Sequence, residues 1–176
     1  MAPQRPRPPS PPPAPAPPAL DALDTRLLDL LQQDASLPIR ALADRAGSSP
    51  ATCQRRIARL RERGVLLRQV AIVDRRLVGQ PLTVFVSVEL DRQNAALLRA
   101  FEQRMAQQPE VMACYEVSGE SDFLVIVIAE SMDRYHAFTR AVFSGLNNVR
   151  NFKSMFAMNC SKFETRVPLP AASDAG

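Results

Sequence analysis

The chain has 176 residues and a mass of 19.4 kDa, with 46% hydrophobic and 23% charged residues, which suits one medium domain or two small ones and excludes a wholly disordered chain. No apolar run approaches the roughly 20 residues that a membrane helix needs, so we expect a cytoplasmic protein with no membrane partner. Arg and Lys outnumber Asp and Glu by 13 to 7 in residues 1–80 but not in residues 81–176, where the count is 9 to 11. We therefore expect the N-terminal half to bind a phosphate-bearing partner.

Residues that carry metal or catalytic chemistry are scarce. There is one histidine, His136, and the three cysteines are too far apart for a CxxC metal motif or a disulfide framework. No Ser/His/Asp or Cys/His constellation, GxGxxG motif or phosphate loop is present. We expect no catalytic residues, no metal and no cofactor.

Ten of the 16 prolines lie in residues 1–18, where no apolar periodicity is found. Such a composition cannot build a packed core. We predict a disordered, proline-rich arm over residues 1–19 and place it outside the fold.

Three helices are predicted over residues 20–66. The first opens near Asp21 and has leucines at three- and four-residue spacing. The second covers about 38–46 and ends at Gly47, and the third has Ser49 as its N-cap, Pro50 at its first position and Gly64 after its end. Three short helices with a tight turn between the last two indicate a helix-turn-helix domain.

The third helix has one apolar stripe and one basic face. Cys53, Ile57 and Leu60 share the stripe and must face the other helices. Arginine can bond guanine edges bidentately, while serine hydroxyls and free amides at a helix N-terminus suit phosphates. We predict contacts with double-stranded DNA from Ser48, Ser49, Thr52, Arg55, Arg56 and Arg59.

The C-terminal half alternates strands and helices. A short strand at 65–73 and a polar linker ending at Pro81 should separate the two domains, with the strand-and-linker segment spanning 67–81. Beyond it we predict strands at 82–90, 111–118, 123–129 and 149–163, a helix around 97–105, a tight turn at 119–122 and a helix over about 132–146. The order βαββαβ is a ferredoxin-like domain over 82–166, followed by a flexible tail at 167–176. The whole chain is thus of the α+β class.

The predicted sheet is apolar on both faces. The strand at 123–129 is apolar at every position, and Phe85, Met112 and Cys114 are apolar on the side opposite their strands' main series. Two helices cover only one face, so the other needs a second cover. Packing against the same sheet of a second copy would supply it, and predicts a homodimer that presents two helices to two half-sites.

Two motifs resemble the leucine-responsive and asparagine-responsive regulators, the Lrp/AsnC family, over about residues 20–168. The first is the N-terminal segment with its Gly-x-Ser-Pro turn and Cys-x-x-Arg-x-x-x-Leu core, and the second is VSGESDFLVIV, which is similar to the family's Gly-Asp-x-Asp ligand turn. The resemblance implies a sequence-specific transcription regulator that responds to a small amino-acid effector, and dimers that assemble into a tetramer or octamer.

The turn at 118–122 is the expected effector site. A zwitterionic amino acid needs amide donors for its carboxylate and an acidic group for its ammonium, which we assign to Asp122 with Glu120 as a second carboxylate. Glu120 replaces the family's usual aspartate, and Phe152 and Ser154 stand where many relatives have small polar residues. The predicted effector-binding residues are Ser118, Gly119, Glu120, Asp122, Phe152 and Ser154.

Three alternatives stay open. A nucleoid-associated architectural protein with little sequence selectivity would use the same basic helix and the same oligomer. An RNA-binding module or an amino-acid-metabolising enzyme can also have a ferredoxin-like domain. The acidic balance of that domain and the missing catalytic constellation argue against these two.

Overall fold

The computed structural model describes residues 19–144 and 148–169, so residues 1–18 of the expected arm at 1–19 and residues 170–176 of the expected tail lie outside the described residues. The described chain divides into two compact units. One contains residues 19–71 together with 162–169, and the other contains residues 72–144 and 148–161. The N-terminal unit is therefore built from both ends of the described chain. No helix among the described residues is long and apolar enough to cross a membrane.

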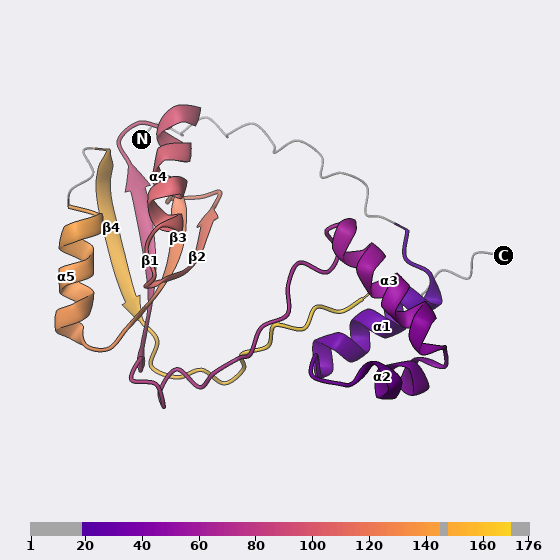
Figure 1. The fold of residues 1–176 in the computed structure, drawn as a ribbon. Coiled ribbons are helices and arrows are strands. Elements are labelled where there is room, and N and C mark those ends of the chain that lie inside the picture. The colour runs from indigo at the N-terminus through magenta and orange to yellow at the C-terminus, as the bar shows by residue number, and fades with distance from the viewer. Residues whose placement is uncertain (1–18, 145–147, 170–176) are drawn as a thin grey trace. The chain divides into compact units, whose positions relative to one another are not determined.

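The N-terminal unit is a three-helix domain made of α1 (Ala22–Gln33), α2 (Ile39–Ala46) and α3 (Pro50–Glu62) (Figure 1). Asp21 caps α1 by accepting a hydrogen bond from the Asp24 amide at 2.9 Å. Gly47 ends α2 at φ +66°, a left-handed conformation that favours glycine. The predicted helix-turn-helix is confirmed. Its core is formed by Leu27, Leu31, Leu42, Ala43, Ala46, Cys53 and Ile57.

The second unit is a four-stranded antiparallel sheet in the order β2-β3-β1-β4, with two helices. This is the predicted ferredoxin-like arrangement. Its elements are β1 (Leu82–Leu90), α4 (Ala95–Ala106), β2 (Val111–Glu116), β3 (Phe123–Ala129), α5 (Met132–Val142) and β4 (Val149–Phe156).

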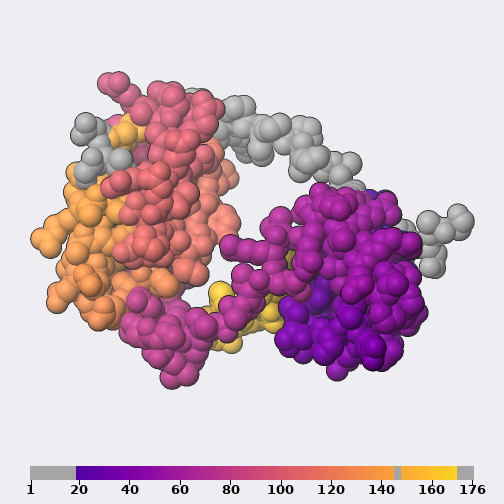
Figure 2. All heavy atoms as spheres, in the orientation of Figure 1, coloured from indigo at the N-terminus to yellow at the C-terminus, as the bar shows by residue number. Residues whose placement is uncertain are grey.

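Helices α4 and α5 cover one face of this sheet. Side chains of both helices share one buried core with the strands, and the space-filling view shows the atoms of α4 and α5 in the orientation of Figure 1 (Figure 2). The covered face is closely packed. The ring centroids of Phe101 on α4 and Phe123 on β3 lie 4.5 Å apart, and those of Phe143 and Phe152 lie 5.0 Å apart. The buried strand residues on this face are Val84, Val86, Val88, Leu90, Phe123, Val125, Val127 and Ala129.

The other face has no helix over it. Along β3, fully buried residues alternate with the half-buried Leu124, Ile126 and Ile128. Because directly paired residues point to one side of a sheet, Ile126 shares this open face with Phe85 on β1, which in turn pairs with Met155 on β4. Met155 is 53% exposed. The apolar second face that the sequence predicts is present.

One residue expected on the open face is on the other side. Cys114 pairs with Val125 and packs against the covered core, because the ladder register shifts between Val111 and Ala113. At this irregularity in β2, the side chains that follow switch to the other face of the sheet. A prediction that assumes strict alternation of faces along a strand cannot anticipate this switch. Met112 lies within this irregularity, has no paired residue on β3 and is 61% exposed, so its face stays a prediction.

One predicted strand is absent, and two others are shorter than predicted: β2, which ends at Glu116 instead of 118, and β4. Residues 65–73 form neither helix nor strand, and β4 ends at Phe156 instead of 163. A strand needs a neighbouring edge to bond to. β4 pairs with β1, whose first residue is Leu82, and the last backbone bond of this pair runs from the Ala157 amide to the Thr83 carbonyl at 2.9 Å. Beyond that point β4 has no partner strand.

Candidate nucleic-acid interface and ligand turn

The predicted DNA-binding face of α3 presents two unengaged arginines. Arg55 and Arg59 are exposed, and within the described part of the chain neither guanidinium makes a hydrogen bond or ion pair. They are one helical turn apart, at i and i+4, and therefore point the same way. A guanidinium with all five donors available can bond a guanine edge or a phosphate.

The start of α3 is held by its cap. The Ser49 hydroxyl accepts from the Thr52 amide at 3.2 Å and donates to the Thr52 hydroxyl at 2.9 Å. The cap predicted from sequence is confirmed. Ser48, half-buried, donates its amide to the Ala43 carbonyl at 3.0 Å. Both serines thus fix the turn between α2 and α3, and their use in DNA contact remains a prediction.

Arg56, also predicted to contact DNA, lies in an ion pair with α1. Its Nη1 atom is 2.5 Å from Asp21 Oδ2 and 3.3 Å from Asp24 Oδ1, and Asp24 is only 3% exposed. The hydrogen bond with Asp21 raises the pKa of Arg56. The Asp24 backbone amide, followed by Arg56, lowers the pKa of Asp21. This arrangement joins the recognition helix to the first turn of α1.

Arg26 is a further arginine engaged within the fold, and sequence reasoning missed it. It supports the end of α2. Arg26 on α1 donates from Nη1 to the Ala46 carbonyl at 2.9 Å. That carbonyl belongs to the last residue of α2, next to the left-handed Gly47, where helix carbonyls lack intrahelical donors. The charge of Arg26 is therefore used in the fold, which a count of basic residues cannot reveal.

The predicted ligand turn is an exposed loop between β2 and β3. Ser118, Gly119 and Glu120 are exposed, and Gly119 has φ +137°, a backbone conformation that disfavours other residues. Among the described residues, the amides of Gly119 and Glu120 have no backbone acceptor. This loop therefore offers two adjacent free backbone amides and the carboxylate of Glu120.

Asp122 is engaged within the fold. Its Oδ2 atom accepts from the Leu90 amide at 2.6 Å, and its Oδ1 atom accepts from Gln93 Nε2 at 2.5 Å. Its own amide donates to the Val88 carbonyl at 2.9 Å. The side chain thus ties the start of β3 to the end of β1. A carboxylate has about four acceptor positions, so two directions remain for a ligand.

Phe152 and Ser154 lie on the helix-covered face of the sheet. Phe152 packs against Phe143, and the Ser154 hydroxyl is 2.5 Å from the hydroxyl of the buried Tyr135, whose pKa is raised by burial. These two β4 residues therefore point into the core of their own unit. The structure does not bring them together with the exposed turn residues Ser118–Glu120.

Comparison with known proteins follows this division of the chain. Residues 20–61 match the AsnC-type helix-turn-helix domain, and residues 83–167 match the Lrp/AsnC ligand binding domain. The chain belongs to the Lrp/AsnC family. This Lrp/AsnC protein is a transcription regulator with a helix-turn-helix DNA-binding domain and is not an enzyme.

Relatives and solved structures match most of the chain. An uncharacterized HTH-type transcriptional regulator of Haemophilus influenzae is 44% identical over 143 residues, which are 81% of this chain and 85% of the relative. An AsnC family regulator from Agrobacterium tumefaciens has a TM-score of 0.80 and 34% identity, covering 85% of this chain and 97% of its own. The regulator NMB0573 of Neisseria meningitidis, solved with L-Met, has a TM-score of 0.79 and 26% identity over the same shares.

Proposed function

We propose that this Lrp/AsnC protein binds specific operator sequences through α3 and changes its DNA binding when a small amino acid occupies the turn at Gly119. Thr52, Arg55 and Arg59 contact bases, and Ser48 and Ser49 lie at phosphates. The observation that carries the DNA part is the contrast on one helix between unengaged and engaged arginines. Arg55 and Arg59 have free guanidinium groups, whereas Arg56 is bonded to Asp21 and positions the helix.

The effector part rests on the chemistry of the turn. The free amides of Gly119 and Glu120 suit a carboxylate, and the Glu120 side chain or the remaining lone pairs of Asp122 suit an ammonium group. A related regulator of similar fold was solved with L-Met, which supports an amino acid as the ligand class. Because Phe152 and Ser154 point into the core, they act on this site by shaping the sheet beneath it.

Assembly completes the proposal. The open sheet face with Phe85, Ile126 and Met155 is apolar and half-exposed, so a second copy packed on it forms a homodimer. Two copies present two α3 helices, as two half-sites of an operator require. Dimers then associate into a tetramer or octamer, and an amino acid bound at the turn biases that association.

Selection from a random DNA pool followed by footprinting tests the DNA part. Wild type should enrich one motif, and Arg55→Ala and Arg59→Ala should each lose about 1 to 3 kcal/mol on it. Arg140→Ala, which removes one positive charge from α5, is the matched control and should leave the footprint unchanged. Wild-type binding without any enriched motif would instead identify the architectural alternative.

Calorimetric titration with each of the 20 standard amino acids tests the effector part. We expect one or a few to bind wild type, and Glu120→Gln or Gly119→Ala to weaken that binding at least tenfold. Glu116→Gln, an exposed change at the end of β2, is the control. Wild type that binds none of the 20 amino acids contradicts the effector assignment.

A further inference from the structure

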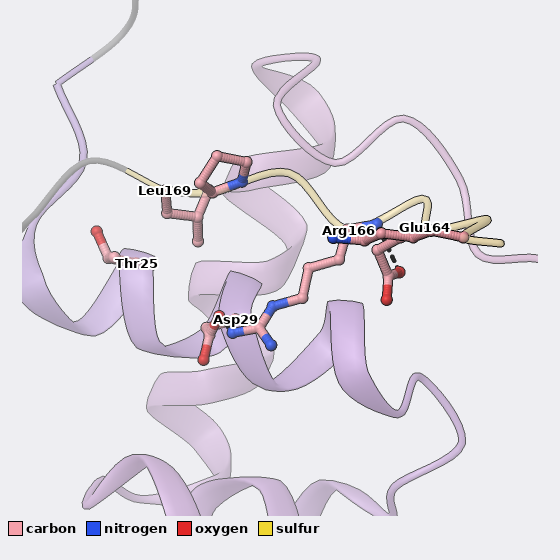
Figure 3. A pocket seen from close by; sticks show the side chains of 7 residues that line it. Thr25, Asp29, Glu164, Arg166 and Leu169 are labelled. Atoms are coloured by element: carbon pink, nitrogen blue, oxygen red, sulfur yellow. Dashed lines mark hydrogen bonds and ion pairs between the residues drawn. The ribbon is translucent and has the colours of Figure 1, made fainter.

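The last described residues of the chain, 162–169, lie along α1 in the N-terminal unit (Figure 3). Arg166 reaches α1, with its Nη2 atom 2.6 Å from Asp29 Oδ1. The next residue, Val167, is held through its backbone: its amide donates to Gln32 Oε1 at 2.8 Å, and its carbonyl accepts from Gln32 Nε2 at 3.2 Å. We call residues 162–169 the C-terminal segment. Residues 167–169, which we expected to begin a flexible tail, belong to it.

These contacts fix the register of the segment. The primary amide of Gln32 pairs with both polar groups of one peptide residue, as a neighbouring strand would. The ion pair of the preceding residue sets which residue occupies that position, since a shift by one residue would remove Arg166 from Asp29. Glu164 adds a local bond by accepting from the Arg166 amide at 3.0 Å. The segment is therefore docked by sequence-specific contacts.

The docking residues of α1 form one stripe. Thr25, Asp29 and Gln32 follow the i, i+4, i+7 spacing of a single helix face. Thr25 and Asp29 line a hollow together with residues of the C-terminal segment, and Gln32 bonds Val167. On another part of the same helix, Asp24 and its N-cap Asp21 hold Arg56 of α3. Helix α1 thus touches both the recognition helix and the C-terminal segment.

Chain connectivity gives this contact a consequence. The ferredoxin-like unit begins after the linker that follows α3, and the chain leaves it through β4 and residues 157–161 before reaching α1. The unit is therefore joined to the helix-turn-helix domain at both of its ends. The segment is thus a connection between β4 and α1 that is separate from the linker at 65–81.

We propose that the C-terminal segment is a second tether, docked on the Thr25/Asp29/Gln32 stripe of its own chain. It passes displacements at the end of β4 to α1, and through Arg56 to α3. The docking is independent of the proposed effector, whereas the transmission rests on the proposed function. The two claims are tested separately.

Zero-length cross-linking tests the docking in the full-length protein. Arg166→Lys places an amine beside Asp29, and carbodiimide couples an amine to a carboxylate only when they are in contact. Mass spectrometry should find this cross-link in Arg166→Lys and not in Arg166→Lys/Asp29→Asn. In a mixture of isotopically labelled and unlabelled chains, the cross-link should join peptides of the same label. Mixed-label peptides, or no cross-link, overturn docking on the chain's own α1.

Hydrogen exchange gives a second, independent measure. The Val167 amide should exchange at least tenfold more slowly in wild type than in Gln32→Ala, because that variant removes its acceptor. Gln54→Ala, an exposed change on α3 of the same unit, is the control and should leave Val167 protected. Equal exchange in wild type and Gln32→Ala contradicts the docking.

Transmission is tested by measuring DNA affinity on the motif that wild type selects. The affinity is measured with and without the amino acid that binds wild type, and the ratio of the two values reports the transmission. In Asp29→Ala/Gln32→Ala we expect this ratio to fall at least fivefold towards one, with the calorimetric affinity for the amino acid unchanged. An unchanged ratio overturns transmission through the segment. If wild type binds none of the amino acids, the proposed effector function fails together with transmission, while the cross-link still decides the docking.

Discussion

Arg56 on α3 donates a hydrogen bond to Asp21, the residue that caps α1, over 2.5 Å. One carboxylate therefore closes the start of one helix and holds the middle of another. The same guanidinium lies 3.3 Å from the buried Asp24. These three side chains form a polar link between the recognition helix and α1.

Arg56→Ala should destabilise the helix-turn-helix domain by about 1 to 3 kcal/mol, because it leaves the Asp24 carboxylate buried without its partner. Arg55→Ala should leave stability within about 0.5 kcal/mol, since its side chain is exposed and unengaged. Thermal denaturation measures both, and selection on random DNA should show the Arg56→Ala motif unchanged in sequence. A new base preference in Arg56→Ala, with wild-type stability, would make Arg56 a direct base contact.

The domain should lose stability in acid through Asp21. The Asp24 amide, followed by Arg56, holds the pKa of Asp21 below its ordinary value, so the charged form is favoured by folding. This contribution to the free energy of unfolding is fully present above about pH 3.9, the pKa of Asp in the unfolded chain. It is lost as the pH falls through the lower pKa that Asp21 has in the folded protein. Asp21→Asn keeps a good N-cap but has no charge to lose. Its unfolding free energy should fall less than that of wild type between pH 5 and 2 in denaturant titrations.

Adjacent residues of β3 should respond differently to a buried charge. Val127 is fully buried beneath the helices, so Val127→Asp should prevent folding, as judged by circular dichroism. Ile126 is on the open face, so Ile126→Asp should keep the secondary structure but shift the protein to monomers in light scattering. An Ile126→Asp variant that keeps the wild-type mass would show that this face is not the dimer interface.

Asp122→Ala should lower stability by about 1 to 3 kcal/mol even without ligand, because the Leu90 amide loses its acceptor. Glu120→Gln should not, since Glu120 is exposed in the turn. Chemical denaturation of both variants measures this difference. Equal stability of Asp122→Ala and wild type would mean that Asp122 serves only the ligand.

Cys114 should resist alkylation in the folded protein. Burial, followed by the charge of Glu102, raises the pKa of its thiol to about 11, so roughly one molecule in a thousand carries the reactive thiolate at pH 8. Cys160 is exposed and should react with iodoacetamide much faster. Peptide mass spectrometry over time distinguishes the two sites. Equal labelling rates in native protein would contradict the burial of Cys114.

Local sequence determined most of the fold. The leucine spacing before Gln33, the cap at Ser49 and the glycine after Ala46 each specify a helix or its end by short-range interactions. The alternation in β1 and the fully apolar β3 likewise predict strands and a sheet with two apolar faces. These features depend on residues within one or two turns of each other, which is why a single sequence suffices for them.

Tertiary structure alone decided which polar side chains are free. Arg55 and Arg56 are equivalent in the sequence, yet one is exposed and the other is bonded to residues 32 and 35 positions away. The same holds for Asp122, which bonds β1, and for Arg166, which bonds Asp29 across 137 positions. Ion pairs and side-chain hydrogen bonds require two groups to meet at short range, and only the packing of distant segments brings them there.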